Sequence, residues 1–121
     1  MLLVTSNKSK QLLFVSYIGR VDLVEFQKFR EDFEKQVGEL APGFRLLVDF
    51  SQLEFMTLDC APELGRIMDQ LGQAGVSMVV RIIPDPSKDI GVNILAAFHY
   101  QRRPRLVTCK NMAEAVRILE L

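Results

Sequence analysis

The sequence predicts an α/β fold with a mixed, mostly parallel sheet and the element order β-β-α-β-α-β-α-β-α. Two strand-like runs near the N-terminus are separated only by a short polar stretch, so they should pair as a hairpin. Strand-like apolar runs then alternate with segments of helical periodicity, which implies right-handed crossovers between parallel strands. The chain has 121 residues, nearly half of them hydrophobic, and this predicts one domain spanning residues 1–121.

The N-terminal hairpin is expected from two runs rich in β-forming residues. Leu2–Val4 is the first strand, and the polar stretch up to Lys10 is turn-like. Gln11–Gly19 is the second strand. A first helix follows, with Asp22 as its N-cap and Glu25 at the capping-box position. Its apolar face repeats at helical spacing through Phe26, Phe29, Phe33, Val37 and Leu40, and Pro42-Gly43 ends the segment.

The middle of the chain reads as strand, turn, helix and strand. Phe44–Phe50 contains an unbroken apolar run, which is typical of a central strand buried on both faces. The turn Phe55–Cys60 leads into a helix that Gly72 and Gly75 close. Residues 76–83 form the next strand, whose apolar run is interrupted by Arg81. The inner stripe of the helix is Ala61, Leu64, Ile67, Met68 and Leu71.

The C-terminal part predicts a third helix, a last strand and a fourth helix. The third helix covers about residues 88–100, and Pro104 stops it. Arg105–Cys109 is the last strand. Asn111 caps the final helix, with Glu114 at the capping-box position. The inner stripe of this helix is Met112, Ala115, Val116 and Leu119.

The turn before the second helix is the first candidate for a working surface, because a helix N-terminus exposes free N–H groups and favours negative charge. Pro62 indicates where that helix begins. A helix capped at Thr57 would need a hydrogen bond from residue 62 to the Leu58 carbonyl, and proline has no N–H. A helix capped at Asp59 places Pro62 in the tolerated first turn. We therefore expect Asp59 to be the N-cap and Asp59→Ala to cost about 1 kcal/mol.

These elements resemble the STAS domain, the family of sulfate transporters and anti-sigma-factor antagonists. The resemblance spans essentially the whole chain, and its clearest parts are Leu46–Ser51, Leu53–Met56, Thr57–Asp59 and Asn111–Val116. It implies a non-enzymatic bacterial regulator that binds a protein partner. In regulatory members, a kinase-like anti-sigma factor phosphorylates a serine in the turn, and this modification switches binding. The partner-binding residues that the resemblance implies here are Thr57, Leu58 and Asp59.

The chain departs from the family at the phospho-acceptor. The usual turn has an Asp-Ser pair, whereas the matching pair here is Thr57-Leu58, and leucine cannot be phosphorylated. Thr57 offers a hydroxyl one position early, which an ordinary turn or capping role explains best. With Asp59 at the helix start, the domain is expected either to be a permanently negative form of the switch or to have lost switching.

Other surfaces offer alternatives. The third helix is apolar over more than one stripe, and Ile90, Ile94 and Phe98 would form either a wall for a lipid or small apolar ligand or a homodimer surface. Arg102, Arg103 and Arg105 could bind an anion or an acidic partner. Cations that complement a helix C-terminus are the more ordinary explanation of that cluster.

Several classes of function are disfavoured. Fifteen basic and fifteen acidic residues give no global attraction to nucleic acid. Neither a signal-peptide pattern nor a membrane-spanning run is present, so a cytoplasmic protein with reduced Cys60 and Cys109 is expected, and a disulfide between them is disfavoured. The sequence has no metal-ligand spacing and no cofactor motif. Nothing orients His99 toward Cys109 as a catalytic pair, so we expect no enzyme activity.

Overall fold

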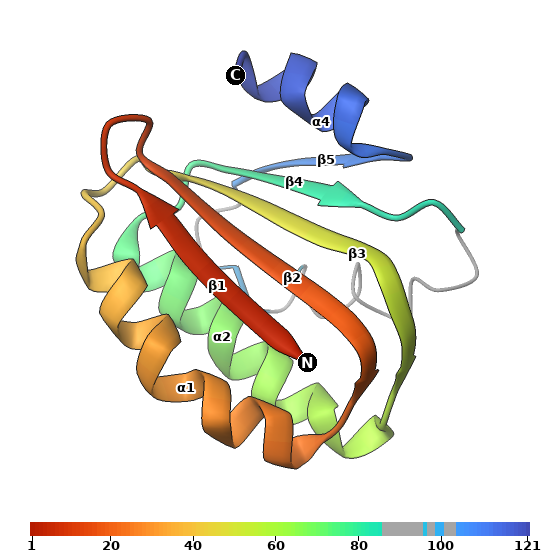
Figure 1. Ribbon diagram of the computed structural model, residues 1–121. Coiled ribbons are helices and arrows are strands. Elements are labelled where there is room, and N and C mark those ends of the chain that lie inside the picture. Colours follow the sequence, from red (N-terminus) through yellow and green to blue (C-terminus); the bar gives the residue numbers. More distant parts are fainter. Residues whose placement is uncertain (86–95, 97–98, 101–103) are drawn as a thin grey trace.

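The computed structural model describes residues 1–85, 96, 99, 100 and 104–121. Within these residues the predicted order of elements is confirmed, with five strands and three helices (Figure 1). The helix expected at residues 88–100 lies mostly outside the described residues. The strands are β1 (Leu2–Asn7), β2 (Leu12–Val21), β3 (Arg45–Met56), β4 (Met78–Ile82) and β5 (Arg105–Cys109). The helices are α1 (Leu23–Gly38), the 3₁₀ turn η1 (Leu58–Cys60), α2 (Ala61–Ala74) and α4 (Met112–Leu119).

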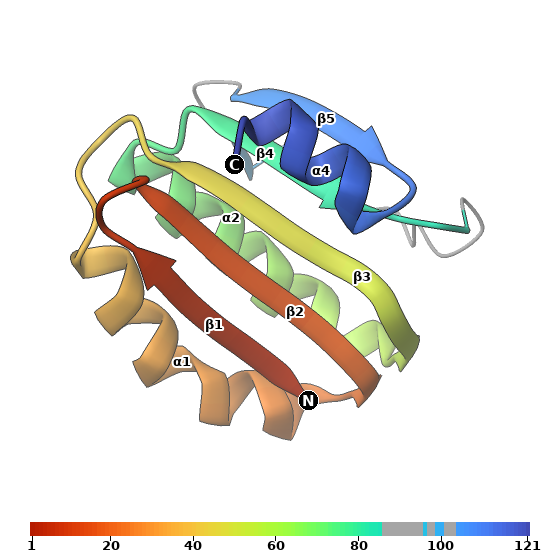
Figure 2. The same cartoon turned by 45° about the horizontal axis from the view of Figure 1, so that its top comes forward.

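The strands form one sheet in the order β1-β2-β3-β4-β5. β1 and β2 are antiparallel and every later pair is parallel, so the prediction of a mixed, mostly parallel sheet is confirmed. Because the order in the sheet follows the order in the chain, right-handed crossovers place α1 and α2 on the same face. Helix α4 follows the last strand and covers the opposite face over β4 and β5 (Figures 1 and 2).

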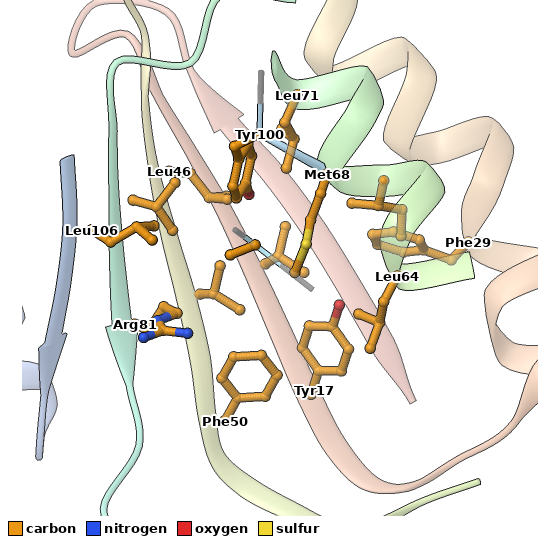
Figure 3. Close-up of a pocket in the computed structure, with 15 residues that line it drawn as sticks. Tyr17, Phe29, Leu46, Phe50, Leu64, Met68, Leu71, Arg81, Tyr100 and Leu106 are labelled. Atoms are coloured by element: carbon orange, nitrogen blue, oxygen red, sulfur yellow. The ribbon is translucent and has the colours of Figure 1, made fainter. Parts of the chain in front are cut away.

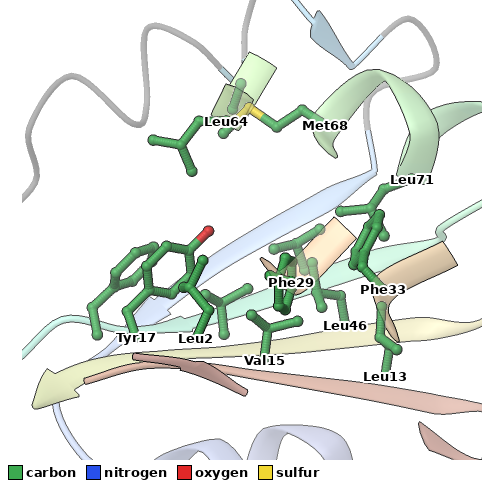
Figure 4. Packing of buried hydrophobic residues seen from close by; sticks show 14 of the residues in the cluster. Leu2, Leu13, Val15, Tyr17, Phe29, Phe33, Leu46, Leu64, Met68 and Leu71 are labelled. Atoms are coloured by element: carbon green, nitrogen blue, oxygen red, sulfur yellow. The ribbon is translucent and has the colours of Figure 1, made fainter. Parts of the chain in front are cut away.

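The larger core lies between the sheet and helices α1 and α2 (Figure 4). The predicted phenylalanine stripe of α1 is confirmed, since Phe26, Phe29 and Phe33 are all buried. Burial of each such side chain stabilises the fold by about 1.5–3 kcal/mol. A second cluster lies under α4, and the two clusters together explain the apolar run of β3, which has cores on both sides. The buried residues of the second cluster are Leu12, Leu47, Val80, Ile82, Cys109, Ala115 and Leu119.

The predicted caps of the first and last helices are confirmed. The backbone N–H of Glu25 donates to Asp22 Oδ1 at 3.1 Å, and that of Glu114 donates to Asn111 Oδ1 at 2.9 Å. The Glu114 carboxylate in turn accepts from the backbone N–H of Lys110 at 2.9 Å. These bonds satisfy N–H groups that a helix start otherwise leaves without a partner.

Several elements differ from the prediction in their bounds or packing. Strand β1 runs on to Asn7, β2 ends at Val21, and β4 is shorter than expected. Strand β3 continues to Met56, so Phe55 belongs to the strand and not to the turn. The register of β2 against β3 shifts on both sides of Gly19, whose φ of +66° suits glycine, and pairing resumes as far as Val21 opposite Met56. In α4, Met112 is exposed, and Ile118 instead packs against the second cluster.

Candidate functional site

The turn Thr57–Asp59 lies where β3 ends and α2 begins (Figure 1). The backbone N–H of Thr57 donates to the carbonyl of Val21 at 3.2 Å. This bond holds the turn beside the end of β2 and the start of α1. The turn, which links β3 to α2, is therefore also hydrogen-bonded to the connection between β2 and α1.

The prediction that Asp59 is the N-cap was wrong. The helical path starts at Thr57 with the 3₁₀ turn η1, and α2 follows directly with Pro62 as its second residue. The reason is a hydrogen bond that is specific to 3₁₀ geometry. The N–H of Ala61 donates to the carbonyl of Leu58 in the i→i−3 pattern, so this carbonyl does not depend on the N–H that Pro62 lacks.

The side chains of the turn are bonded to one another. The Thr57 hydroxyl donates to Asp59 Oδ1 and lies 3.2 Å from Cys60 Sγ. Cys60 is buried in the larger core. Burial raises the pKa of the Cys60 thiol, and the negative charges of Asp59 and Asp22 raise it further. The thiol is therefore protonated at neutral pH, and the Thr57 hydroxyl is engaged within the turn.

Exposed apolar side chains occur on the turn and on the elements β3 and α1 that meet it. Leu58 is 84% exposed, the largest value among the large hydrophobic residues that the structure describes. Phe55 at the end of β3 and Val24 at the start of α1 are each about half exposed. We call these three residues the turn patch. The sequence indicated only that Leu58 replaces a serine, and its exposure could not be known before the turn was placed.

Charged side chains on the elements that carry the turn patch form ion pairs and a cation–π contact. Glu63, in the first turn of α2, pairs with Arg30 of α1 at 3.1 Å and with Arg66 at 3.5 Å. Near the other side, the guanidinium of Arg20 lies 5.2 Å from the centre of the Phe55 ring, within the range of a cation–π contact. Such exposed pairs contribute up to about 1 kcal/mol each, so they orient side chains more than they stabilise the fold.

The other predicted surfaces are only partly visible. Ile90, Ile94 and Phe98 lie outside the described residues, as do Arg102 and Arg103. Arg105 is exposed at the start of β5, where its backbone N–H donates to the carbonyl of Ser77 at 3.1 Å. The apolar-ligand, homodimer and anion sites therefore stay predictions.

Cys60, Cys109 and His99 do not lie together in the described structure. Cys60 and Cys109 are free, and they belong to clusters on opposite faces of the sheet. Nδ1 of His99 lies 3.1 Å from Asp69 Oδ1 of α2, on the face away from Cys109. Within residues 1–85, 96, 99, 100 and 104–121, no group of three or more His, Cys, Asp or Glu side chains is placed to hold a metal ion. None of the described helices is both long enough and apolar enough to span a bilayer.

A small cavity between the sheet and α2 was not predicted. Its volume is about 40 Å³, and its walls are almost entirely apolar, although Tyr17, Tyr100 and Arg81 are among the described residues that line it (Figure 3). Arg81 is only 5% exposed, although arginine is rarely buried. The signal in the sequence was the arginine that interrupts an apolar strand.

Comparison with known proteins identifies the fold. No protein-family model and no curated protein matches the sequence. The structure is similar to that of an uncharacterised DUF3478-family protein with a SpoIIAA-like fold from Shewanella loihica, with a TM-score of 0.74 and 13% identity over 98% of this chain and 92% of that one.

Two anti-sigma factor antagonists have the same architecture. Unphosphorylated SpoIIAA matches with a TM-score of 0.61 and 15% identity, over 99% of this chain and 98% of that one. An antagonist from Mycobacterium paratuberculosis matches with a TM-score of 0.61 and 19% identity, over 100% of this chain and 94% of that one. Identities this low show the fold alone. The chain therefore has the SpoIIAA-like, STAS-like fold that its sequence predicts.

Proposed function

We propose that this protein is a non-enzymatic regulator in the bacterial cytoplasm that binds a protein partner through the turn patch and the start of α2. The partner class is a kinase-like anti-sigma factor. The observation that carries the proposal is Leu58, a large apolar side chain left 84% exposed on a turn whose other side chains are bonded to each other. In the free protein the Leu58 side chain is exposed to water. Burying it at the centre of an interface would therefore favour binding.

The fold supports this class of function. Two structural neighbours are anti-sigma factor antagonists, and SpoIIAA has been solved in unphosphorylated and phosphorylated forms. In this chain, Leu58 occupies the position that matches the phospho-acceptor serine of the family, and the Thr57 hydroxyl is bonded to Asp59. We therefore propose that binding is constitutive and is not switched by phosphorylation of the turn.

A binding experiment with a matched control tests the surface. The kinase-like ATPase encoded by the host would be purified and titrated with wild-type protein, Leu58→Glu and Leu121→Glu in a calorimeter. Leu121 is also an exposed leucine, but it lies beyond α4 on the other face of the sheet. We expect Leu58→Glu to weaken binding at least about tenfold and Leu121→Glu to leave it unchanged. Equal affinity for all three proteins would remove the turn patch as the interface.

The loss of switching is tested separately. The protein is incubated with the same ATPase and ATP, and its intact mass is followed with time. We expect no phosphoryl addition at Thr57. Stoichiometric addition there, with loss of partner binding, would show that the switch persists with a shifted acceptor.

The alternative function, binding of a lipid or small apolar ligand by Ile90, Ile94 and Phe98, depends on residues outside the described part of the chain. Native mass spectrometry of freshly purified protein tests it, because a co-purified lipid would add a defined mass. The cavity under α2, at about 40 Å³, is far smaller than the ~150 Å³ that accommodates a benzene molecule. That cavity does not supply an acyl-chain site.

A further inference from the structure

The free edge of β1 carries backbone groups without a partner. Among the described strands, β1 pairs only with β2 (Figures 1 and 2). Met1 and Ile18 exchange both of their backbone hydrogen bonds, at 2.6 and 2.8 Å, so every second residue from Met1 onward faces β2. The N–H and C=O groups of the residues between, Leu2, Val4 and Ser6, therefore point away from the sheet. None of these groups is hydrogen-bonded within the part of the chain that the structure describes.

This edge is suited to pair with another strand. Natural proteins usually guard an open edge with a charged residue, a proline or a bulge. β1 reads LLVTSN and has neither a charge nor a proline, and its register against β2 runs without a shift. Leu2 is only 8% exposed and Val4 packs against the larger core, so the strand is held in place from below. An extended segment could therefore be added to the sheet through main-chain hydrogen bonds.

Helix α1 lies next to β1 at the margin of the sheet and gives this edge a charge (Figure 2). Its carboxylates Glu25, Asp32 and Glu39 recur every seventh residue, and so they lie on one side of the helix. Two contacts show that this side faces β1. Glu25 Oε2 lies 3.9 Å from the backbone nitrogen of Met1. At the other end of the strand, the Ser6 hydroxyl donates to Glu39 Oε2 at 3.1 Å. We call these three carboxylates the acidic row.

The acidic row decides which occupant the edge favours. Asp32 is level with Val4, because each lies about 10 Å along its element from the contact between Glu25 and Met1. A second copy that paired antiparallel about Val4 would therefore bring the two Asp32 side chains together and place Glu25 near Glu39 of the other copy. Like charges facing each other across an interface are unfavourable. The row thus disfavours self-pairing and favours a segment with basic side chains.

We propose that the free edge of β1 binds an extended segment of a partner protein in which lysine or arginine alternates with other residues. The side chains of an added strand point alternately to the two faces of the sheet. Those on the α1 side would lie over the acidic row, and those on the opposite side would lie beside Leu3, which is 49% exposed. Lys28 and Lys35 are exposed farther round α1 and do not interrupt the row. The site shares no residue with the turn patch.

A short synthetic peptide with alternating lysine and threonine, blocked at both ends and fluorescently labelled, tests the edge at physiological ionic strength. We expect saturable binding by anisotropy, and no binding of a matched peptide with glutamate in place of lysine. Asp32→Lys should weaken binding at least about tenfold. Glu31→Lys makes the same change of charge about 100° round the helix and should alter affinity less than about twofold. Leu58→Glu should bind the peptide as wild type does, which separates this site from the turn patch.

A second pair of variants tests the backbone. Val4→Pro removes an outward N–H without breaking a bond to β2, at a place where an edge strand tolerates proline. It should weaken binding at least about tenfold, whereas Val4→Thr keeps the N–H and should bind as wild type.

Hydrogen exchange shows whether a strand has been added. Peptide binding should slow exchange at the amides of Val4 and Ser6, and change little at Leu3 and Thr5, which already face β2. Equal binding of the lysine and glutamate peptides, or binding without this alternating protection, would overturn the proposal. Sedimentation of the free protein is the last check. A dimer that Val4→Pro dissociates would assign the edge to a second copy instead.

Discussion

The packing of His99 on α2 makes an unusual prediction about Gly65. Glycine within a helix is normally about 1 kcal/mol less favourable than alanine, so Gly→Ala in a helix usually stabilises. At Gly65, however, an added Cβ would lie 2.6 Å from Nε2 and 2.8 Å from Cε1 of His99. The ring would have to move, and its 3.1 Å contact with Asp69 would be lost.

Gly72 provides the matched control in the same helix. A Cβ there would have its nearest neighbour at 3.9 Å, Cδ1 of Tyr100, which is ordinary van der Waals contact. We therefore expect Gly72→Ala to gain about 0.5–1 kcal/mol of stability. Gly65→Ala should instead lose up to about 2 kcal/mol, since displacing a packed side chain typically costs about 1–3 kcal/mol and the gain in helix propensity offsets only about 1 kcal/mol of this.

Urea unfolding of the two variants measures this difference, and a double-mutant cycle identifies its cause. In the His99→Ala background the clash is absent, so Gly65→Ala should become as stabilising as Gly72→Ala. If Gly65→Ala stabilises the wild-type protein as much as Gly72→Ala does, then His99 does not pack against α2 in the way described here.

The other predictions concern helix ends and buried groups. Asp22→Ala should cost about 1 kcal/mol of stability because it removes the α1 cap, whereas Asp59→Ala should change stability by less than about 0.5 kcal/mol. Urea unfolding of the two variants measures this difference. A larger effect for Asp59→Ala than for Asp22→Ala would show that Asp59 is a helix cap after all. Because burial raises the pKa of Tyr17 and Tyr100, the native state holds their protons more tightly than the unfolded chain does. The free energy of unfolding should therefore fall as the pH rises above about 10, by up to about 1.4 kcal/mol per pH unit for each tyrosine. A urea midpoint that does not change with pH in this range would contradict this. Burial also raises the pKa of Cys60, which is 1% exposed, so a thiol reagent should label it only on unfolding, and rapid labelling of the folded protein would refute its burial.

The sequence predicted those parts of the fold that depend on local pattern. The phenylalanine stripe of α1 repeats at helical spacing, and the caps at Asp22 and Asn111 each need only a residue three positions away. Bonds of this range can be read from a single chain. The alternation of strands and helices likewise required parallel pairing, and the sheet has it.

The features that were missed depend on contacts across the fold. The extension of β3 to Met56 follows from its pairing with β2 through a register shift, which no local pattern encodes. The start of the helical path at Thr57 depends on a 3₁₀ bond from Ala61, and α-helical geometry alone predicts a start two residues later. Arg81 reads as an interruption of an apolar strand, and only the folded structure shows that it lines the same small cavity as Tyr17 and Tyr100.

The strand order has a consequence for how the molecule folds. Each strand of the sheet pairs with the strand that precedes it in the chain, so the sheet can grow by adding one strand at a time to its newest edge. No described strand has to be inserted between two that are already paired. Each new strand pairing therefore closes a loop of one crossover only, which keeps the entropic cost of loop closure low for a parallel sheet. A chain emerging from the ribosome could therefore assemble the β1–β2 hairpin first and build the sheet in the order of synthesis.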